Sequence, residues 1–210
     1  FRGDAWFATL IDSDGNLLPA PLQMSKIRIA PAERADLVID FARYPLGSKL
    51  YIVNKLEQLE GREPTGRILN PGTQVLRFDV DAEPPLPDAS RVPALLRELP
   101  PINLAEVVKT REFRFDRVNG VWTVNGKIFD MFQPTATVKQ GSAEIWILRG
   151  GGEWHHPVHI HFEEFRILSR NKQPPPPHER GRKDVVVLQH EEEVRIFMRF
   201  RDYGGKYVMH

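Results

Sequence analysis

The most informative absences are cysteine, long apolar runs and an excess of charge of either sign. With no cysteine among 210 residues, disulfides, thiolate nucleophiles, iron–sulfur clusters and the thiolate of a blue copper site are excluded. No apolar run approaches membrane-spanning length, so we expect no membrane partner. No signal peptide opens the chain, which says little because Phe1 resembles an internal residue. Lys and Arg number 29 against 28 Asp and Glu, a net charge of +1. This balance argues against nucleic acid or an anionic membrane as the main partner.

The residues that are present favour an all-β fold. A hydrophobic content of 41% over 210 residues can supply the core of one large or two small domains. Short segments rich in Val, Ile and Phe, bounded by Gly, Pro or Asp, are typical of strands. These segments are 26–29, 35–41, 50–53, 74–80, 143–148, 184–188, 194–200 and 206–209. Turn signals at Asp14-Gly15 and Asn125-Gly126 complete a pattern that predicts antiparallel sandwiches.

A proline-dense stretch divides the chain. Six prolines between residues 81 and 101 predict an extended connector, with one helical turn around 94–98. We therefore expect a first domain over 1–80, a linker over 81–107 and a second domain over 108–210. The first is short enough to be an incomplete sandwich, whose unpaired edges other chains or missing segments would cover.

Histidines are confined to the second domain. All seven lie from His155 onward, and three of them form the motif His156-Pro-Val-His159-Ile-His161. Because side chains alternate across a strand, His159 and His161 point to one face and His156 points to the other. Imidazole binds copper, zinc, iron and nickel alike, so the spacing predicts two metal sites without choosing the metal. We expect His155, His178 and His190 to be ordinary surface residues, because their neighbours are loop or charged residues.

Several segments together resemble the multicopper oxidases, in particular the bacterial laccase, spore-coat oxidase and bilirubin oxidase branch. The matching segments are 14–19, 29–36, 141–146, 156–161, 165–168, 174–177, 182–184 and 205–210. They occur in the family's order and cover nearly the whole chain. The resemblance implies cupredoxin-like Greek-key β-sandwiches, one partial and one nearly complete. Residues 1–80 would be the C-terminal part of the family's middle domain, and 108–210 most of its last domain.

The resemblance also implies a role for individual residues. His156 would bind the type 1 copper, His159 the type 2 copper, and His161 and His210 the paired type 3 coppers. Asp184 is expected to orient a ligand imidazole as a hydrogen-bonding neighbour, a role that metal sites commonly need. No catalytic residue is assigned beyond these ligands. The family carries four coppers per complete enzyme, and we expect few or none in this chain alone.

The sequence departs from the family pattern after His210. The type 1 cysteine, the later histidine and methionine ligands, and the family's first domain are absent. We therefore expect a fragment, inactive alone, of a laccase-like, copper-dependent oxidoreductase with oxygen as acceptor. The parent would oxidise a small reducing substrate at the type 1 copper and reduce dioxygen to water at a trinuclear cluster. Phenols, aromatic amines, bilirubin, Mn(II) and Cu(I) all fit the family, and its members are mostly periplasmic, secreted or on spore surfaces.

Two alternatives stay open. The chain could be a non-catalytic metal-binding or interaction module derived from this fold. It could also hold a cupin-like zinc or iron site, in which Glu163 or Glu164 and a distant His190 or His210 complete the His159/His161 pair. We expect Trp6, Trp122 and Trp146 to be packing residues, and Trp154 to shape the type 1 region or to pack.

Overall fold

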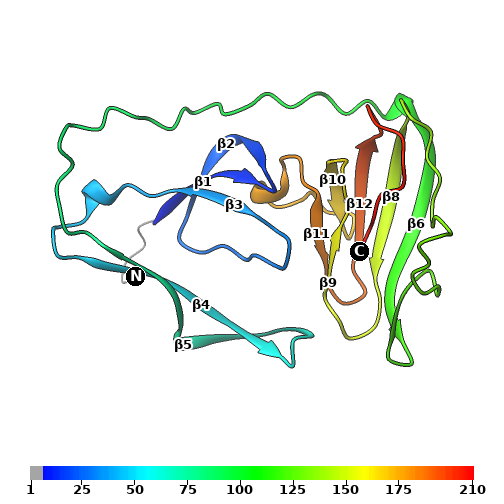
Figure 1. Ribbon diagram of the computed structural model, residues 1–210, viewed down its shortest axis with the longest axis horizontal. Helices are drawn as coiled ribbons and strands as arrows, with labels where there is room; N and C mark the ends of the chain where they lie inside the picture. The colour runs from blue at the N-terminus through cyan, green and yellow to red at the C-terminus, as the bar shows by residue number, and fades with distance from the viewer. Residues whose placement is uncertain (1–6) are drawn as a thin grey trace. The chain divides into compact units, whose positions relative to one another are not determined.

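The computed structural model describes residues 7–210, so Trp6 lies outside the described part (Figure 1). The chain separates into two compact units, one of Phe1–Leu37 with Pro93–His210 and one of Val38–Val92. Strands dominate both units, and over residues 7–210 the helical content is three short 3-10 turns. Among the described residues, no helix has the length and apolar character needed to cross a bilayer. The structure is thus built from sheets, as the sequence predicts.

A five-stranded sheet forms the centre of the first unit. Its strands, in spatial order, are β10 (Phe165–Arg170), β12 (Glu193–Arg199), β8 (Ala143–Gly150), β6 (Val107–Val118) and β7 (Val121–Val124). Figure 1 shows β12, β8 and β6 side by side. The β6–β8 pair is parallel and the other neighbours are antiparallel. In β12 the side chains of Val194, Ile196 and Met198 are fully buried on the face that the second sheet covers, whereas Arg195 and Arg199 on the other face are partly exposed and Phe197 there is also buried.

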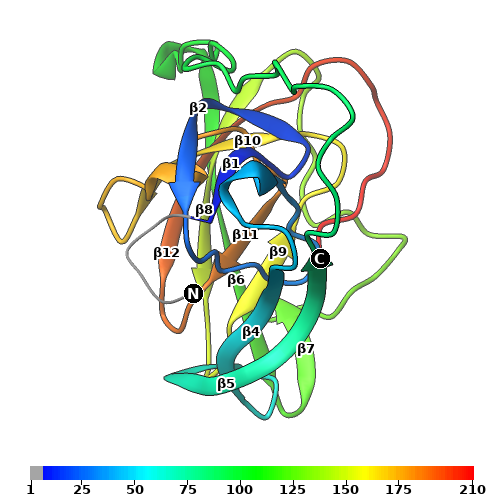
Figure 2. The same ribbon diagram turned by 90° about the vertical axis from the view of Figure 1, so that its left-hand side faces the viewer.

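A two-stranded sheet packs over this core. It consists of β9 (His156–His159) and β11 (Val185–Leu188), which pair antiparallel (Figure 2). Val158 and Val186 from the small sheet pack in one cluster with Trp146, Phe165 and other residues of the large sheet. Two sheets that bury one common layer make a β-sandwich. Complete burial of each such side chain stabilises the fold by roughly 1.5–3 kcal/mol.

A three-stranded sheet, in the order β2-β1-β3, belongs to the same unit. Its strands are β1 (Ala8–Ser13), β2 (Asn16–Met24) and β3 (Ala35–Val38). The β1–β2 connection is the predicted Asp14-Gly15 turn, and both residues have positive φ, at 56° and 78°. Two consecutive left-handed residues match the twist of a tight hairpin. Asp14 is also buried, with 3% of its surface exposed, so this turn has contacts beyond its own hairpin.

The second unit is a long hairpin. It contains the 3-10 turn η1 (Phe41–Arg43) and the strands β4 (Lys49–Leu59) and β5 (Glu63–Asp79). The two strands pair antiparallel with three register shifts along the ladder. Phe41 packs on Phe78 at a ring-centroid distance of 5.3 Å. The predicted strands 50–53 and 74–80 both lie in this hairpin, although 74–80 overruns β5 by one residue.

Several sequence predictions of local structure are wrong. Residues 26–29 are not a strand, and neither are 206–209, of which only Met209 forms an isolated bridge with Ile160. The predicted strand 35–41 ends at Val38. After the predicted Asn125-Gly126 turn the chain forms only one isolated bridge, Val124 with Lys127. No helical turn forms over 94–98; instead η2 (Leu104–Glu106) begins where the Asn103 side chain accepts the Ala105 N–H. A side-chain cap thus places this turn after the prolines.

The remaining 3-10 turn is η3 (Pro177–Glu179), which begins at the last of the four consecutive prolines 174–177. Glu179 is buried and receives two hydrogen bonds from Arg170. The bounds of the two compact units differ from the predicted domains 1–80 and 108–210 and the linker 81–107. That division by family domain stays a prediction.

Candidate metal centre

Strand β9 sets the directions of the histidines in the motif. It pairs with β11 so that His156 lies opposite Leu188 and His159 opposite Val185. Along the strand His156 and Val158 are buried, whereas Pro157 and His159 are partly exposed. The chain continues with Ile160 buried and His161 exposed. The two-residue alternation therefore places His159 and His161 on one face and His156 on the other, in agreement with the predicted geometry.

Backbone pairing brings His210 to the same face. The N–H of His159 donates to the carbonyl of His210 at 2.7 Å, and the His210 N–H donates back at 3.0 Å. The bridge between Ile160 and Met209 and the bond from His161 N–H to Val208 O, at 3.0 Å, extend this pairing. Residues directly opposite each other in a ladder present their side chains on the same side. His210 therefore faces the His159 and His161 imidazoles.

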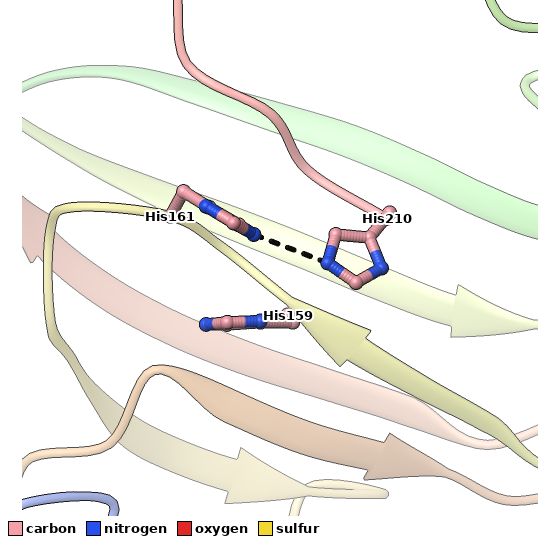
Figure 3. A group of neighbouring side chains, drawn as sticks. All are labelled: His159, His161 and His210. Carbon is pink, nitrogen blue, oxygen red and sulfur yellow. Dashed lines mark hydrogen bonds between the residues drawn. The ribbon is translucent and has the colours of Figure 1, made fainter. Parts of the chain in front are cut away.

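The three imidazoles form a compact group (Figure 3). One ring nitrogen from each of His159, His161 and His210 lies within 4.8 Å of the others. The Nε2 atoms of His161 and His210 are 3.1 Å apart, and the His159 and His161 ring centroids are separated by 4.4 Å. His159 is partly buried and the other two rings are exposed. Three lone-pair donors therefore meet at one accessible point.

Electrostatics favour the neutral form of His159. Burial lowers the pKa of this imidazole, and the neighbouring His161 and His210 lower it further, while the Asp184 carboxylate opposes them. A neutral imidazole is the form that binds a metal ion. The neutral His159 imidazole can therefore bind a metal ion at neutral pH without first losing a proton.

The donor set fits copper. Three imidazole nitrogens suit Cu, Zn, Fe and Ni, and no carboxylate of the described residues joins the group. The contact between the His161 and His210 Nε2 atoms brings together two groups that both serve as metal ligands in proteins. Geometry and chemistry thus define a nitrogen-rich metal site, and the choice of metal depends on the family.

His156 lies in a separate, aromatic environment. Its Nε2 is 2.9 Å from the carbonyl oxygen of Gly151, so Nε2 carries the proton and Nδ1 keeps the lone pair. The ring meets Trp122 edge-on at 5.8 Å and Phe115 at 6.4 Å. Trp122 in turn meets Trp154 at 5.0 Å. This fixed tautomer and apolar wall are the surroundings that a metal-binding imidazole needs.

Asp184 lies beside the three-histidine group. Its Oδ2 is 3.6 Å from the Nε2 of His159, an ion-pair distance rather than a hydrogen bond. The carboxylate accepts two short bonds from the Arg34 guanidinium, at 2.8 Å and 2.7 Å. Asp184 is therefore placed where the predicted orienting role requires it, and the role itself stays a prediction. The sequence analysis missed Arg34, which had no signal other than its place in the matching segment 29–36.

The remaining histidines lie away from this group. His155 Nδ1 is 2.7 Å from an Arg28 nitrogen, His190 contacts the carbonyl of Gly152, and His178 lies in η3. Among the described residues, none of the three belongs to the metal-ligand group. Of the carboxylates named for a cupin-like site, Glu163 accepts hydrogen bonds from Arg201 and Glu164 pairs with Arg182.

An all-β sandwich that gathers three imidazoles beside one of its strands is the architecture expected of a cupredoxin-like protein with a metal site. The family model described as multicopper oxidase matches residues 101–210. The chain therefore belongs to the multicopper oxidase family, and copper is the metal that this family implies. The all-β, cupredoxin-like fold predicted from the sequence is confirmed, as is the predicted family.

Individual relatives agree with this assignment. The chain is 35% identical over 96% of its length to a bilirubin oxidase of Albifimbria verrucaria, of which it covers 36%. It is 30% identical over 95% of its length to a laccase of Bacillus subtilis, of which it covers 42%. The crystal structure of the multicopper oxidase McoA from Aquifex aeolicus matches with a TM-score of 0.81 at 24% identity, over 100% of this chain and 47% of that one. The chain thus spans less than half the length of these relatives.

Proposed function

We propose that this chain is part of a laccase-like oxidase that takes electrons from a reducing substrate and passes them to dioxygen, forming water. The observation that carries the proposal is the convergence of His159, His161 and His210 on one face of the chain, with His156 on the opposite face. Two separate groups of ligands on the two sides of one strand suit an enzyme that accepts electrons at one metal and uses them at another.

In this proposal the ligands divide as the family pattern implies. His156 would bind a type 1 copper through Nδ1, His159 a type 2 copper, and His161 and His210 type 3 coppers. Copper, when bound, supplies the one-electron redox chemistry that links substrate oxidation to dioxygen reduction. The chain would contribute only part of the type 1 ligand set, because it holds no cysteine.

The protein's own contribution is placement. The paired hydrogen bonds between the His159 and His210 backbones hold two of the ligands opposite each other before any metal arrives. The Gly151 carbonyl fixes the His156 tautomer, and Phe115 and Trp122 pack against that ring. Preorganised ligands lose little entropy on binding, which favours affinity and a defined geometry.

Copper titration of the 210-residue chain tests the metal site. In this chain alone the three imidazoles, which the family pattern divides among different coppers, can together hold one ion, so we expect one Cu(II) per chain. Its electron paramagnetic resonance spectrum should show coupling to imidazole nitrogens. His161→Ala and His210→Ala should each weaken binding strongly, since each removes one of three donors. His178→Ala, outside the group, is the matched control. Binding that survives both site variants, or no binding by the unaltered chain, would refute the proposed site.

Oxidase activity is tested in the complete protein that contains these residues. Dioxygen uptake should accompany oxidation of a phenol or of bilirubin, the substrate in the name of one relative. His156→Ala should abolish substrate oxidation, whereas His178→Ala should leave it unchanged. Full turnover in the His156→Ala protein would exclude the proposed role of His156 as a ligand on the electron-accepting side.

A further inference from the structure

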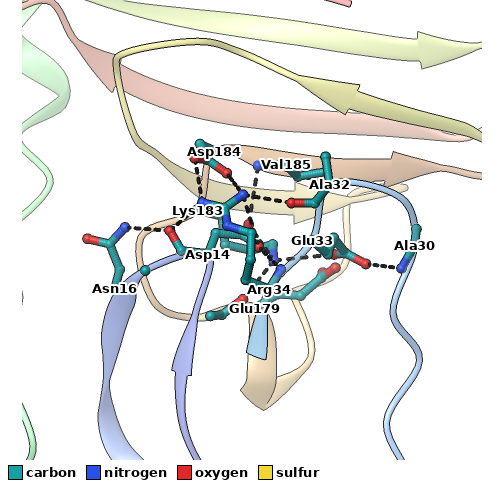
Figure 4. Close-up of polar contacts among 12 residues, drawn as sticks. Asp14, Asn16, Ala30, Ala32, Glu33, Arg34, Glu179, Lys183, Asp184 and Val185 are labelled. Carbon is teal, nitrogen blue, oxygen red and sulfur yellow. Dashed lines mark hydrogen bonds and ion pairs between the residues drawn. The ribbon is translucent and has the colours of Figure 1, made fainter. Parts of the chain in front are cut away.

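Arg34 reaches the three-histidine group from a distant part of the chain. Its guanidinium binds Asp184, which is 150 residues away in the sequence, and donates at 2.8 Å to Oδ1 and at 2.7 Å to Oδ2 (Figure 4). A guanidinium that donates two parallel bonds fixes the plane of a carboxylate as well as its position. One of the two oxygens held in this way is the Oδ2 that lies 3.6 Å from His159 Nε2.

The guanidinium is itself fixed by main-chain groups. The same two nitrogens donate to the carbonyl oxygens of Ala32, at 2.7 Å, and Asp14, at 2.8 Å. The backbones of Arg34 and Asp14 are also joined, because the Asp14 N–H donates to the Arg34 carbonyl at 3.0 Å. Arg34 is therefore a rigid link between a tight turn and a carboxylate rather than a mobile surface side chain.

Asp14 ties this link to strand β11. Its Oδ1 accepts the Arg34 N–H at 3.1 Å, and its Oδ2 accepts the Val185 N–H at 3.2 Å. The ammonium of Lys183 lies 2.9 Å from the same Oδ2, with 3% of the Lys183 side chain exposed. The residues on both sides of Asp184 are thus anchored to the Asp14 turn. Asp184 is therefore held in two ways, through its neighbours Lys183 and Val185 and through its own carboxylate, which Arg34 binds.

We propose that Arg34 is a positioning residue for the metal group, acting on His159 through Asp184. A carboxylate held beside Nε2 favours the tautomer that carries its proton there, which leaves the lone pair on Nδ1 and steadies the ring. This inference rests on the proposed metal site, since His159 matters only if it binds a metal. It adds a residue of the 29–36 segment to a site whose ligands all lie from His159 onward.

The test is a double-mutant cycle on Cu(II) binding to the 210-residue chain. Arg34→Gln should weaken binding by about 10- to 100-fold, the usual effect of losing a partner of a ligand. In an Asp184→Asn background the same change should have little further effect, because the link is already broken. Arg34→Lys keeps the charge without the paired donors and should restore binding only in part. Arg114→Gln is the matched control, since Arg114 also pairs with carboxylates and its side chain is 41% exposed against 45% for Arg34.

A second readout needs no metal. Ring ¹⁵N chemical shifts of His159 report its tautomer, and Arg34→Gln should move them while Arg114→Gln should not. Equal loss of Cu(II) affinity in both Asp184 backgrounds, full affinity in Arg34→Lys, or unchanged His159 shifts would each overturn the positioning role. Failure of the unaltered chain to bind Cu(II) would instead refute the proposed metal site, and the ring shifts would still decide whether Arg34 acts on His159.

Discussion

Replacing Arg170 by methionine should be among the most destabilising single changes in the first unit. The Arg170 guanidinium donates to both oxygens of Glu179, at 2.6 Å and 2.7 Å, and to both oxygens of Glu192, at 2.9 Å each. It also donates to the Val187 carbonyl at 3.0 Å. The side chains of Arg170, Glu179 and Glu192 are only 15%, 9% and 6% exposed. Arg170→Met would therefore leave two neighbouring buried carboxylates without a counter-charge.

The expected loss follows from that burial. Removing one partner from a buried ion pair costs about 3–5 kcal/mol, whereas an exposed pair contributes about 1 kcal/mol or less. For a unit of this size we expect the Tm to fall by roughly 10 °C. Arg114→Met, which breaks the exposed contacts with Glu191 and Asp116, is the control and should cost less than about 1 kcal/mol.

The stability loss of Arg170→Met should also depend on pH, in a direction that can be predicted. In Arg170→Met the unpaired, buried carboxylates should have pKa values raised above those of the unfolded chain. A raised carboxyl pKa means that the folded variant binds protons more readily, so stability is gained as the pH falls through that pKa and lost as it rises. Urea unfolding at pH 7 and pH 5 should therefore show a smaller gap between the unaltered chain and the variant at pH 5. A loss below about 1 kcal/mol at pH 7, or a gap that widens on acidification, would refute this account of the triad.

Three further changes probe packing and metal binding. Gly150→Ala should destabilise by about 1–3 kcal/mol or more, because its Cβ would clash with the Gln189 carbonyl oxygen. Gly204→Ala, whose Cβ meets nothing within 4 Å, should cost less, and urea unfolding compares the two variants. Thr123→Val should be neutral or stabilising in the same assay, because the buried Thr123 Oγ1 has no hydrogen-bond partner. Cu(II) at about 100 times its Kd should stabilise the chain by about 2.7 kcal/mol in thermal unfolding, and a chelator should reverse the effect.

Local patterns predicted the ligand directions well. Two-residue alternation alone separates His156 from His159 and His161, since it depends only on β9 being a strand. Asp14-Gly15 likewise predicts its turn, because few other dipeptides adopt two left-handed residues without strain. Where a segment needs partners to form a strand, the pattern fails: 26–29 and 206–209 have the right composition but no continuous ladder.

Long-range pairings could not be predicted from the residues themselves. Nothing in the composition around His210 says that its backbone pairs with His159; that placement came only from the family resemblance. The contact of Arg34 with Asp184 and the burial of Lys183 depend on how distant segments pack. A charged Arg-Lys-Asp run before an apolar strand is ordinarily solvated, so the sequence gives no sign that its middle residue is buried.

The His159–His210 backbone pairing also governs how the site would exchange its metal. Residues 206–210 form no regular strand and are held to 159–161 by only a few main-chain hydrogen bonds and one bridge. Such segments open locally at a much lower free energy than the core strands. Release of copper from the 210-residue chain would then need only the separation of this short segment from 159–161, with the sandwich still folded. Amide hydrogen exchange at His159 and His210 would report the same opening. The exchange rates at these two positions would therefore indicate the rate at which the site can release copper.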